Sequence, residues 1–256
     1  MGSALTQGAL KAGVFKNHEV IALDPKPPAI AALGPEVSPA SSLDDIISRS
    51  DALMLCVKPY QIHDLLTRVA ELSSGPDDLL VISIAAGVTI AAMEESCQNK
   101  ARVARCMPNT PSLVGQGASA FAVGSTATDE DSAFTSALLN SVGLAYEVPE
   151  KLIDSVTGVS GSGPAYVYTF IEALADGGLL EGLPRDKALA LAAQTVLGAA
   201  TMIVESGEHP ALLRDRVTSP GGTTIAGLAA LEEGGIRTTV INAVRTAAAK
   251  ARELGK

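Results

Sequence analysis

Two short, continuous apolar runs constrain the fold of this chain more than any other feature of its sequence. Ala52–Val57 (ALMLCV) and Leu79–Ile84 (LLVISI) have the length and the unbroken hydrophobicity of strands that are buried on both faces. Between them, Pro59–Leu72 places apolar side chains at helical spacing, and Pro59 suits a first helical turn. Buried strands joined by a helix form the βαβ unit of a parallel sheet.

The same alternation extends through the first half of the chain. Apolar residues at helical spacing predict a helix over Ala4–Ala12, closed by Gly13. The further strands and one further helix are expected at Val20–Leu23, Arg102–Cys106, Ala118–Val123, Asp129–Asn140 and Ala145–Val148. The sequence therefore predicts a doubly wound, mostly parallel α/β domain.

The second half of the chain has no convincing strand and predicts an all-α domain. Its helices are expected at Pro164–Leu180, Pro184–Glu205, Ile225–Glu232 and Ile236–Leu254. The pairs Gly177-Gly178 and Gly234-Gly235 are expected to mark helix ends or breaks. We place the boundary near Pro149, which gives an N-terminal domain of residues 1–149 and a helical domain of residues 150–256.

The composition excludes several classes of protein. The 256 residues are 47% hydrophobic with 3% aromatic residues and no Trp, so aliphatic side chains must build a large core, and intrinsic disorder is excluded. A formal net charge of −9 and a pI near 4.8 argue against binding to nucleic acid or to an anionic membrane.

Cysteine usage and hydropathy predict a cytoplasmic protein. Cys56, Cys97 and Cys106 are widely spaced without a Cys-x-x-Cys pair, which indicates small core residues in a reducing compartment. No secretory signal opens the chain, and the most apolar segment, Ala188–Val204, falls short of the ~20 residues that a bilayer requires. The three histidines do not cluster with a Cys or a carboxylate, so no metal site is expected.

A ligand in a doubly wound fold lies beyond the carboxyl ends of the strands. Asp24 ends one expected strand and follows Gly2 by 22 residues, which matches the ~20-residue offset of the acid that binds the adenosine ribose in dinucleotide folds. Two other readings stay open, in which Asp24 is a turn residue before Pro25 and Gly2 is an N-terminal remnant. The segments expected at these ends are Met1-Gly2-Ser3-Ala4, Asp24, Val57-Lys58-Pro59 and Ala85-Ala86-Gly87.

Three loops combine small or rigid residues with polar groups. Two prolines hold the amide and hydroxyl of Asn109 and Thr110 in place, although an ordinary Pro-rich loop would read the same way. Ser160–Pro164 (SGSGP) and Thr218–Thr224 (TSPGGTT) each precede an expected helix, where free backbone N–H groups suit a carboxylate or a phosphate. A capped helix with a flexible entry is the alternative for the first of them. For the two loops Ser160–Pro164 and Thr218–Thr224 together, we favour an anion-binding function.

The chain has no Ser/His/Asp set and no carboxylate pair that stands out as a catalytic centre. Chemistry without a strong protein acid or base favours hydride transfer from a bound cofactor.

Five segments make the chain recognisable. VKPYQI, ISIAAGVTI, RCMPNTP, VTGVSGSGPAYVY and VTSPGGTTIAGL, in this order and at these spacings, closely resemble the pyrroline-5-carboxylate reductase family, from Gly2 to Leu254. The resemblance implies an N-terminal Rossmann-type domain and a helical domain that interlocks with a second subunit, with rings of dimers common in the family. It also implies the last step of proline biosynthesis, in which NAD(P)H delivers hydride to the C=N carbon of 1-pyrroline-5-carboxylate and gives L-proline.

The resemblance also assigns roles to matching positions. Thr224 is the residue whose hydroxyl bonds the ring nitrogen of the substrate, and Glu150 approaches the substrate. The substrate carboxylate is held by Thr223 and its neighbouring backbone at Gly221 and Gly222, together with Ser162 and Gly163. The nicotinamide and its ribose are lined by Val57, Lys58, Ala85, Ala86 and Asn109.

Two features differ from the family pattern. The family normally has a first strand ending in a G-x-G-x-M-G-type loop, and only Met1-Gly2 of this pattern is present, so we expect a Rossmann-type sheet whose first strand is missing. Asp24 stands where NADP-preferring members tend to carry a small or basic residue. Its carboxylate favours NADH, whereas Lys26 favours NADPH, so either cofactor is expected.

Two other functions remain open from the sequence. One is another imine or 3-hydroxyacid reductase on the same plan, although a hydroxyacid dehydrogenase is expected to place a Lys of its helical domain near the nicotinamide. The other is an inactive dimerisation partner that lacks a complete cofactor site.

Overall fold

The computed structural model describes residues 1–77 and 79–255 and divides into two compact units. The first unit comprises Met1–Ser162 together with the C-terminal residues from Val244 onward. The second comprises Gly163–Ala243 and is entirely helical. The fold class expected from the sequence, a Rossmann-type α/β domain followed by an all-α domain, is confirmed.

The sheet of the first unit is built from two groups of strands. Its five-stranded part has the order β3-β4-β5-β6-β7, in which β3, β4 and β5 are parallel and β6 runs antiparallel to β5. A separate parallel pair is formed by β1 and β2. The strands are β1 (Val20–Ala22), β2 (Val37–Pro39), β3 (Ala52–Leu55), β4 (Leu80–Ser83), β5 (Arg102–Met107), β6 (Gly117–Val123) and β7 (Gly143–Glu147).

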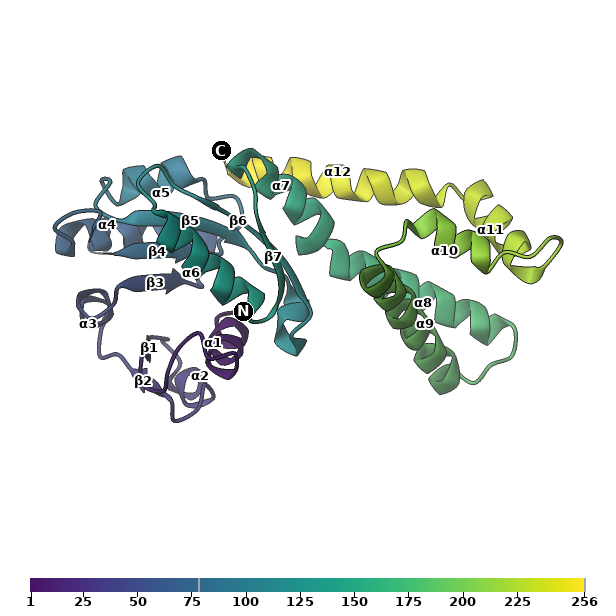
Figure 1. The fold of residues 1–256 in the computed structure, drawn as a ribbon, viewed down its shortest axis with the longest axis horizontal. Helices are drawn as coiled ribbons and strands as arrows, with labels where there is room; N and C mark the ends of the chain where they lie inside the picture. Colours follow the sequence, from purple (N-terminus) through teal and green to yellow (C-terminus); the bar gives the residue numbers. More distant parts are fainter. Residues whose placement is uncertain (78, 256) are drawn as a thin grey trace. The chain divides into compact units, whose positions relative to one another are not determined.

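Alternate side chains of the central strands pack against helices on opposite faces of the sheet. Val81 and Val103 belong to the core that holds α3, α4, α5 and α7, whereas Ile82 and Ala104 belong to the core that holds α1 and α6. Figure 1 shows these two helical layers around the sheet. The helices are α1 (Gly2–Lys11), α2 (Pro27–Ala31), α3 (Leu43–Ser48), α4 (Ile62–Leu72), α5 (Ile90–Ser96), α6 (Asp129–Asn140) and α7 (Ile153–Val156).

A cavity separates the two groups of strands. In the described part of the chain, β1 pairs only with β2 and β3 pairs only with β4, so each has a free edge. The cavity measures about 940 Å³ and is lined by apolar residues of both strands, among them Ile21 and Leu53, and by the first residues of α1. The expected first strand of a Rossmann sheet would occupy this position between β1 and β3.

The C-terminal part of α12 (Ile236–Leu254) packs against a π-helix of the first unit, Thr157–Gly161. Gly158 permits this contact, because a Cβ there would lie 2.5 Å from the backbone oxygen of Val244 and 3.3 Å from the Ala248 methyl. A single turn of π-helix is frequent at functional sites. This turn leads directly into Ser162, the last residue of the unit before the helical one.

The helical unit has a small core of its own. Ala175, Ala188 and Ala192 are its buried apolar residues, and they join α8 to α9. Many large apolar side chains of the same helices are exposed, including Leu191 and Leu197 at 58% and 59%. A face of this kind marks a protein–protein contact. The helices of this unit are α8 (Gly163–Leu180), α9 (Arg185–Ser206), α10 (Pro210–Arg216), α11 (Thr223–Glu233) and the first residues of α12.

Helix α9 is, within the described residues, the one helix whose length and apolar composition would allow it to cross a membrane. It begins with Arg185, Asp186 and Lys187, and only 11% of its most apolar window is buried within the chain. The sequence of Ala188–Val204 is typical of a buried core helix or of a subunit-interface helix, and the exposed apolar side chains of α9 favour the second.

Most expected elements are present, with differences at three places. The sequence did not predict β2, α2, α3, α5, α7 or α10. Gly177 and Gly178 neither end nor break α8, which continues to Leu180. Cys56 was interpreted as a core residue of a buried strand, but β3 ends at Leu55 and Cys56 is exposed. Cys97 and Cys106 are buried as expected, and burial raises the pKa of the Cys106 thiol.

Candidate active site

The ends of β3, β4 and β5 place three candidate segments at one edge of the sheet. Because the strands are parallel, the residues that follow them emerge on the same side. Val57 and Lys58 follow β3, Ala85 and Ala86 follow β4, and Asn109 follows β5 two residues after Met107. Lys58 donates its backbone N–H to Gln61 Oε1 at 3.1 Å, which fixes the turn into α4. This edge is the expected nicotinamide side of the site.

Gly2, Ser3 and Asp24 lie around the cavity between β1 and β3. Gly2 begins α1, and a Cβ on it would lie 3.1 Å from Cys56 Sγ, so a larger residue would press on the segment after β3. Asp24 follows β1 and is exposed, and its Oδ1 accepts from the Lys26 backbone N–H at 2.7 Å. The three residues thus surround one cavity, and the carboxylate of Asp24 stands at its rim.

Asn109 is buried, and both ends of its side-chain amide are bonded to the backbone. Its Nδ2 donates to the Ser160 carbonyl at 3.0 Å, and its Oδ1 accepts from the Ala118 N–H at 2.9 Å. The amide therefore joins the end of β5 to the π-helix and to β6.

The SGSGP segment is divided between the two units. Ser162 donates its backbone N–H to the Thr157 carbonyl at 2.8 Å, which closes the π-helix, and α8 begins at Gly163. Ser162 and Gly163 are both partly exposed. The segment therefore passes directly from the π-helix into α8.

The SPGGTT segment leads into α11 within the helical unit. Gly222 is the N-cap residue and makes no side-chain cap, so the first turn begins with backbone donors of Thr223 and Thr224 that no cap residue satisfies. Gly221 has φ +67°, a left-handed conformation that suits glycine, and Gly222 donates to the Ser219 carbonyl at 3.1 Å. A tight turn thus precedes a helix N-terminus with free backbone N–H groups, a feature that suits an anion.

Glu150 lies in a partly buried ionic cluster that the sequence did not predict. Its Oε1 accepts from Arg105 Nη1 at 3.0 Å and from the Ile90 backbone N–H at 2.7 Å, and Arg105 Nη2 donates to Asp154 Oδ1 at 2.8 Å. An arginine inside the apolar strand RVARCM was the signal, because a buried guanidinium requires carboxylate partners.

The expected site residues therefore form two groups. One group belongs to the first unit and comprises Gly2, Ser3, Asp24, Val57, Lys58, Ala85, Ala86, Asn109, Glu150 and Ser162. The other belongs to the helical unit and comprises Gly163, Gly221, Gly222, Thr223 and Thr224.

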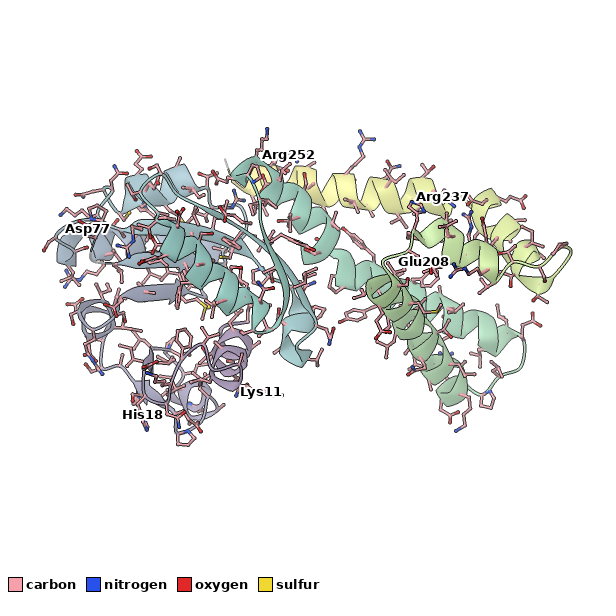
Figure 2. All side chains as sticks on the ribbon, in the orientation of Figure 1. Lys11, His18, Asp77, Glu208, Arg237 and Arg252 are labelled. Carbon is pink, nitrogen blue, oxygen red and sulfur yellow. The ribbon has the colours of Figure 1, made fainter. Side chains whose placement is uncertain are left out.

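The histidines have structural positions. His209 caps α10 by accepting from the Ala211 N–H at 3.2 Å, and His63 Nδ1 lies 2.9 Å from Ser96 Oγ. Figure 2 shows His18 on the loop before β1 and Glu208 on the helical unit, where Glu208 pairs with Arg216 at 2.6 Å. In the described part of the chain, no group of three or more His, Cys, Asp or Glu could hold a metal ion.

A dinucleotide fits the residues present in the first unit. Small side chains follow β4, the first turn of α1 has no side-chain cap, and the Asp24 carboxylate can accept from a ribose hydroxyl. The fold and these residues define the class of protein: an oxidoreductase with a Rossmann-type dinucleotide-binding domain and a helical domain suited to self-association.

Comparison with known proteins identifies the family. A family model described as pyrroline-5-carboxylate reductase dimerisation matches residues 150–254, and one described as NADP oxidoreductase, coenzyme F420-dependent, matches residues 1–87. A pyrroline-5-carboxylate reductase of Methanosarcina acetivorans is 47% identical, over 100% of this chain and 95% of the relative. The chain belongs to the pyrroline-5-carboxylate reductase family.

Solved structures agree with this assignment. The pyrroline-5-carboxylate reductase of Coxiella burnetii has a TM-score of 0.93 at 32% identity, covering 100% of this chain and 95% of that one. The Plasmodium falciparum pyrroline carboxylate reductase with NADP bound has a TM-score of 0.88 at 33% identity, with the same coverage. The expected family, fold class and type of cofactor are confirmed.

Proposed function

We propose that this chain reduces 1-pyrroline-5-carboxylate to L-proline with NADPH or NADH, the last step of proline biosynthesis. The observation that carries the proposal is the SPGGTT turn, which joins uncapped backbone donors to two threonine hydroxyls at the start of α11. A small cyclic imine with one carboxylate matches such a turn, because N–H groups at a helix N-terminus suit the carboxylate and a hydroxyl suits the ring nitrogen.

Residues of the helical unit, together with Ser162 and Glu150 of the first unit, bind the substrate in this proposal. The Thr224 hydroxyl bonds the imine nitrogen and orients the C=N bond. The carboxylate is held by Thr223 with the backbone of Gly221 and Gly222, and by Ser162 and Gly163, while Glu150 approaches the substrate. Orientation supplies much of the rate, since fixed reactants avoid the entropy loss of a bimolecular encounter.

Residues of the first unit bind the cofactor. Gly2 and Ser3 take the pyrophosphate at the start of α1, and Asp24 takes the adenosine ribose. The nicotinamide and its ribose are lined by Val57, Lys58, Ala85, Ala86 and Asn109. When bound, the reduced nicotinamide supplies the hydride for the C=N carbon.

The two parts of the chain have different tasks. Residues 1–149 bind the cofactor, and residues 150–256 bind the substrate and form a dimer through the exposed apolar faces of α8 and α9. The dimers assemble further into a ring. The acidic charge and the Rossmann-type domain support a cytoplasmic enzyme that binds neither nucleic acid nor membrane.

An assay of the purified chain tests the proposal. Oxidation of NADPH and of NADH is followed by the nicotinamide absorbance at about 340 nm, with and without 1-pyrroline-5-carboxylate, and the product is identified by mass spectrometry. The proposal predicts substrate-dependent oxidation and formation of proline. A folded dimer that oxidises neither cofactor would support the inactive-partner alternative.

An assay with 3-hydroxyacids tests the remaining alternative, a 3-hydroxyacid reductase on the same two-domain plan. The helical unit has a single lysine, Lys187, and its Nζ pairs with Asp186 Oδ2 at 3.3 Å on the first turn of α9. Because this lysine is exposed at the start of α9 and belongs to none of the segments assigned to the substrate or the nicotinamide, we expect no oxidation of 3-hydroxyacids. Turnover of a 3-hydroxyacid at a rate comparable to that of the imine would contradict the assignment.

A further inference from the structure

Arg105 is a buried cation that the proposed reaction does not use. Its side chain is 4% exposed, and it lies on β5 opposite Ser83 of β4 and Ala122 of β6. Its guanidinium binds two carboxylates, Glu150 at 3.0 Å and Asp154 at 2.8 Å. Arginine suits this position because its planar fork presents several fixed donors and stays charged when buried.

The Glu150 oxygen that Arg105 binds also holds a third segment. Oε1 of Glu150 accepts from the backbone N–H of Ile90 at 2.7 Å, the first residue of α5. The loop Ala85–Thr89 stands immediately before that residue. One carboxylate oxygen therefore connects β5, the start of α5 and the segment after β7.

The three connected segments carry residues assigned to the site. Strand β5 leads to Asn109, the loop before α5 carries Ala85 and Ala86, and the segment from Glu150 leads through the π-helix to Ser162. Asn109 adds a second connection between the first and the last of these through the Ser160 carbonyl. Arg105 is the residue that binds both carboxylates, Glu150 and Asp154.

We propose that Arg105 is a positioning residue for the reduction, which sets the placement of the Ala85–Thr89 loop relative to the segment that ends at Ser162. This inference rests on the proposed function. Without the guanidinium, the carboxylates of Glu150 and Asp154 lose the cation that they share. Their side chains are only 32% and 17% exposed, so water screens their repulsion incompletely. Their repulsion moves Glu150 away from Ile90, and the loop loses its fixed place.

Arg102 provides a matched control on the same strand. It stands at the opposite end of β5 from Asn109, is 16% exposed, and donates from Nε to Asp131 Oδ2 at 2.8 Å. Burial raises the pKa of Asp131, but hydrogen bonds from Thr128 and Arg102 outweigh burial and hold that pKa below its usual value. Arg102 thus makes a comparable ion pair that touches none of the three site segments. Because it lines the cavity between β1 and β3, where Gly2, Ser3 and Asp24 lie, it is a control for hydrogen exchange at Ile90 and not for cofactor binding or kinetics.

The experiment compares Arg105→Met, Arg105→Lys and Arg102→Met as full-length chains. Kinetic constants for 1-pyrroline-5-carboxylate and NADPH are measured below the melting temperature of each variant, together with the NADPH dissociation constant. Hydrogen exchange is followed for the peptide that contains Ile90.

The inference predicts that Arg105→Met lowers kcat/KM by about 10–100-fold, because displacements of about 1 Å cost rates of this order. It also predicts weaker NADPH binding and faster exchange at Ile90. Arg105→Lys, which keeps the charge but reaches only one carboxylate at a time, recovers part of the loss. Arg102→Met lowers the melting temperature and leaves hydrogen exchange at Ile90 within about twofold of the unchanged protein, a difference of less than about 0.5 kcal/mol.

Two results would overturn the inference. One is kinetic constants and Ile90 exchange in folded Arg105→Met or Arg105→Lys that equal those of the unchanged protein. The other is an equal increase of hydrogen exchange at Ile90 in Arg102→Met, which would indicate a general loss of stability. If the unchanged chain does not reduce 1-pyrroline-5-carboxylate, the proposed function fails. NADPH binding and Ile90 exchange in the Arg105 variants then test the positioning role without the reaction.

Discussion

Replacing Gly158 by alanine tests the packing of α12 on the π-helix. The added methyl would lie 2.5 Å from the Val244 carbonyl oxygen, 3.3 Å from the Ala248 backbone nitrogen and 3.3 Å from its methyl. An ordinary contact of a methyl carbon is about 3.5 Å, so the two helical segments must separate by several tenths of an ångström or more. The nearest atom belongs to the backbone of a helix and cannot rotate away.

The expected cost of Gly158→Ala is about 2–3 kcal/mol, the upper part of the range for overpacked interiors. For a chain of this size, that corresponds to a decrease of about 5–10 °C in melting temperature. Activity also falls, because the π-helix leads to Ser162. Differential scanning calorimetry at one fixed protein concentration measures the first effect, and steady-state kinetics measure the second.

Gly161→Ala is the matched control for this prediction. It changes a glycine of the same π-helix, but its added methyl meets its nearest atoms, on Met107 and Thr157, at 3.5 Å, an ordinary contact distance. We expect its melting temperature to stay within about 2 °C of the unchanged protein. Equal melting temperatures for Gly158→Ala and Gly161→Ala would refute the packing argument.

Four further substitutions test other parts of the account. Thr224→Ala lowers kcat/KM for the imine by about 10–100-fold, through the loss of a hydrogen bond worth about 1.5–3 kcal/mol, and unchanged turnover would remove the role of this hydroxyl. Asp24→Ser raises the ratio of kcat/KM for NADPH to that for NADH by about tenfold, because a carboxylate no longer repels the 2′-phosphate, and an unchanged ratio would contradict its place at the ribose. Asp131→Asn costs about 2 kcal/mol at neutral pH in chemical denaturation. Because the pKa of Asp131 is lowered in the folded state, its contribution is present above about pH 4 and is lost as the pH falls further, so the difference between the two proteins must narrow in acid. Leu197→Glu, which places a charge on the exposed apolar face of α9, shifts the dimer to monomer in light scattering, and a variant that remains dimeric would exclude this face from the interface.

The fold could be predicted where periodicity is strong and long. The unbroken runs ALMLCV and LLVISI gave β3 and β4, and helix α12 was predicted with its observed bounds. Strand β2 was missed because Val37 is followed by Ser38 and Pro39, and a serine and a proline do not resemble a strand in sequence. Gly178 was misinterpreted as a helix break because the sequence does not reveal that Leu183 and Ala188 pack closely against it, where a Cβ would lie 3.1 and 3.4 Å from them.

Site residues could be predicted only where a local sequence pattern, such as the end of a strand or the start of a helix, marks them. Strand ends and helix starts identified Asp24, Ala85 and the turn at SPGGTT. The connections between segments could not be predicted, since Asn109 and Ser160 are 51 residues apart in sequence and Arg105 and Glu150 are 45 apart. Tertiary structure brings such pairs together, and a single sequence records only that a buried arginine needs partners.

Transfer of deuterium from the cofactor tests the central claim most directly. The purified chain is incubated with 1-pyrroline-5-carboxylate and NADPH deuterated at both C4 positions of the nicotinamide, and the product is analysed by mass spectrometry and NMR. The account predicts proline that carries one deuterium, at the carbon of the former C=N bond. Unlabelled proline, or no proline from a folded dimer that binds NADPH, would contradict hydride transfer to the imine.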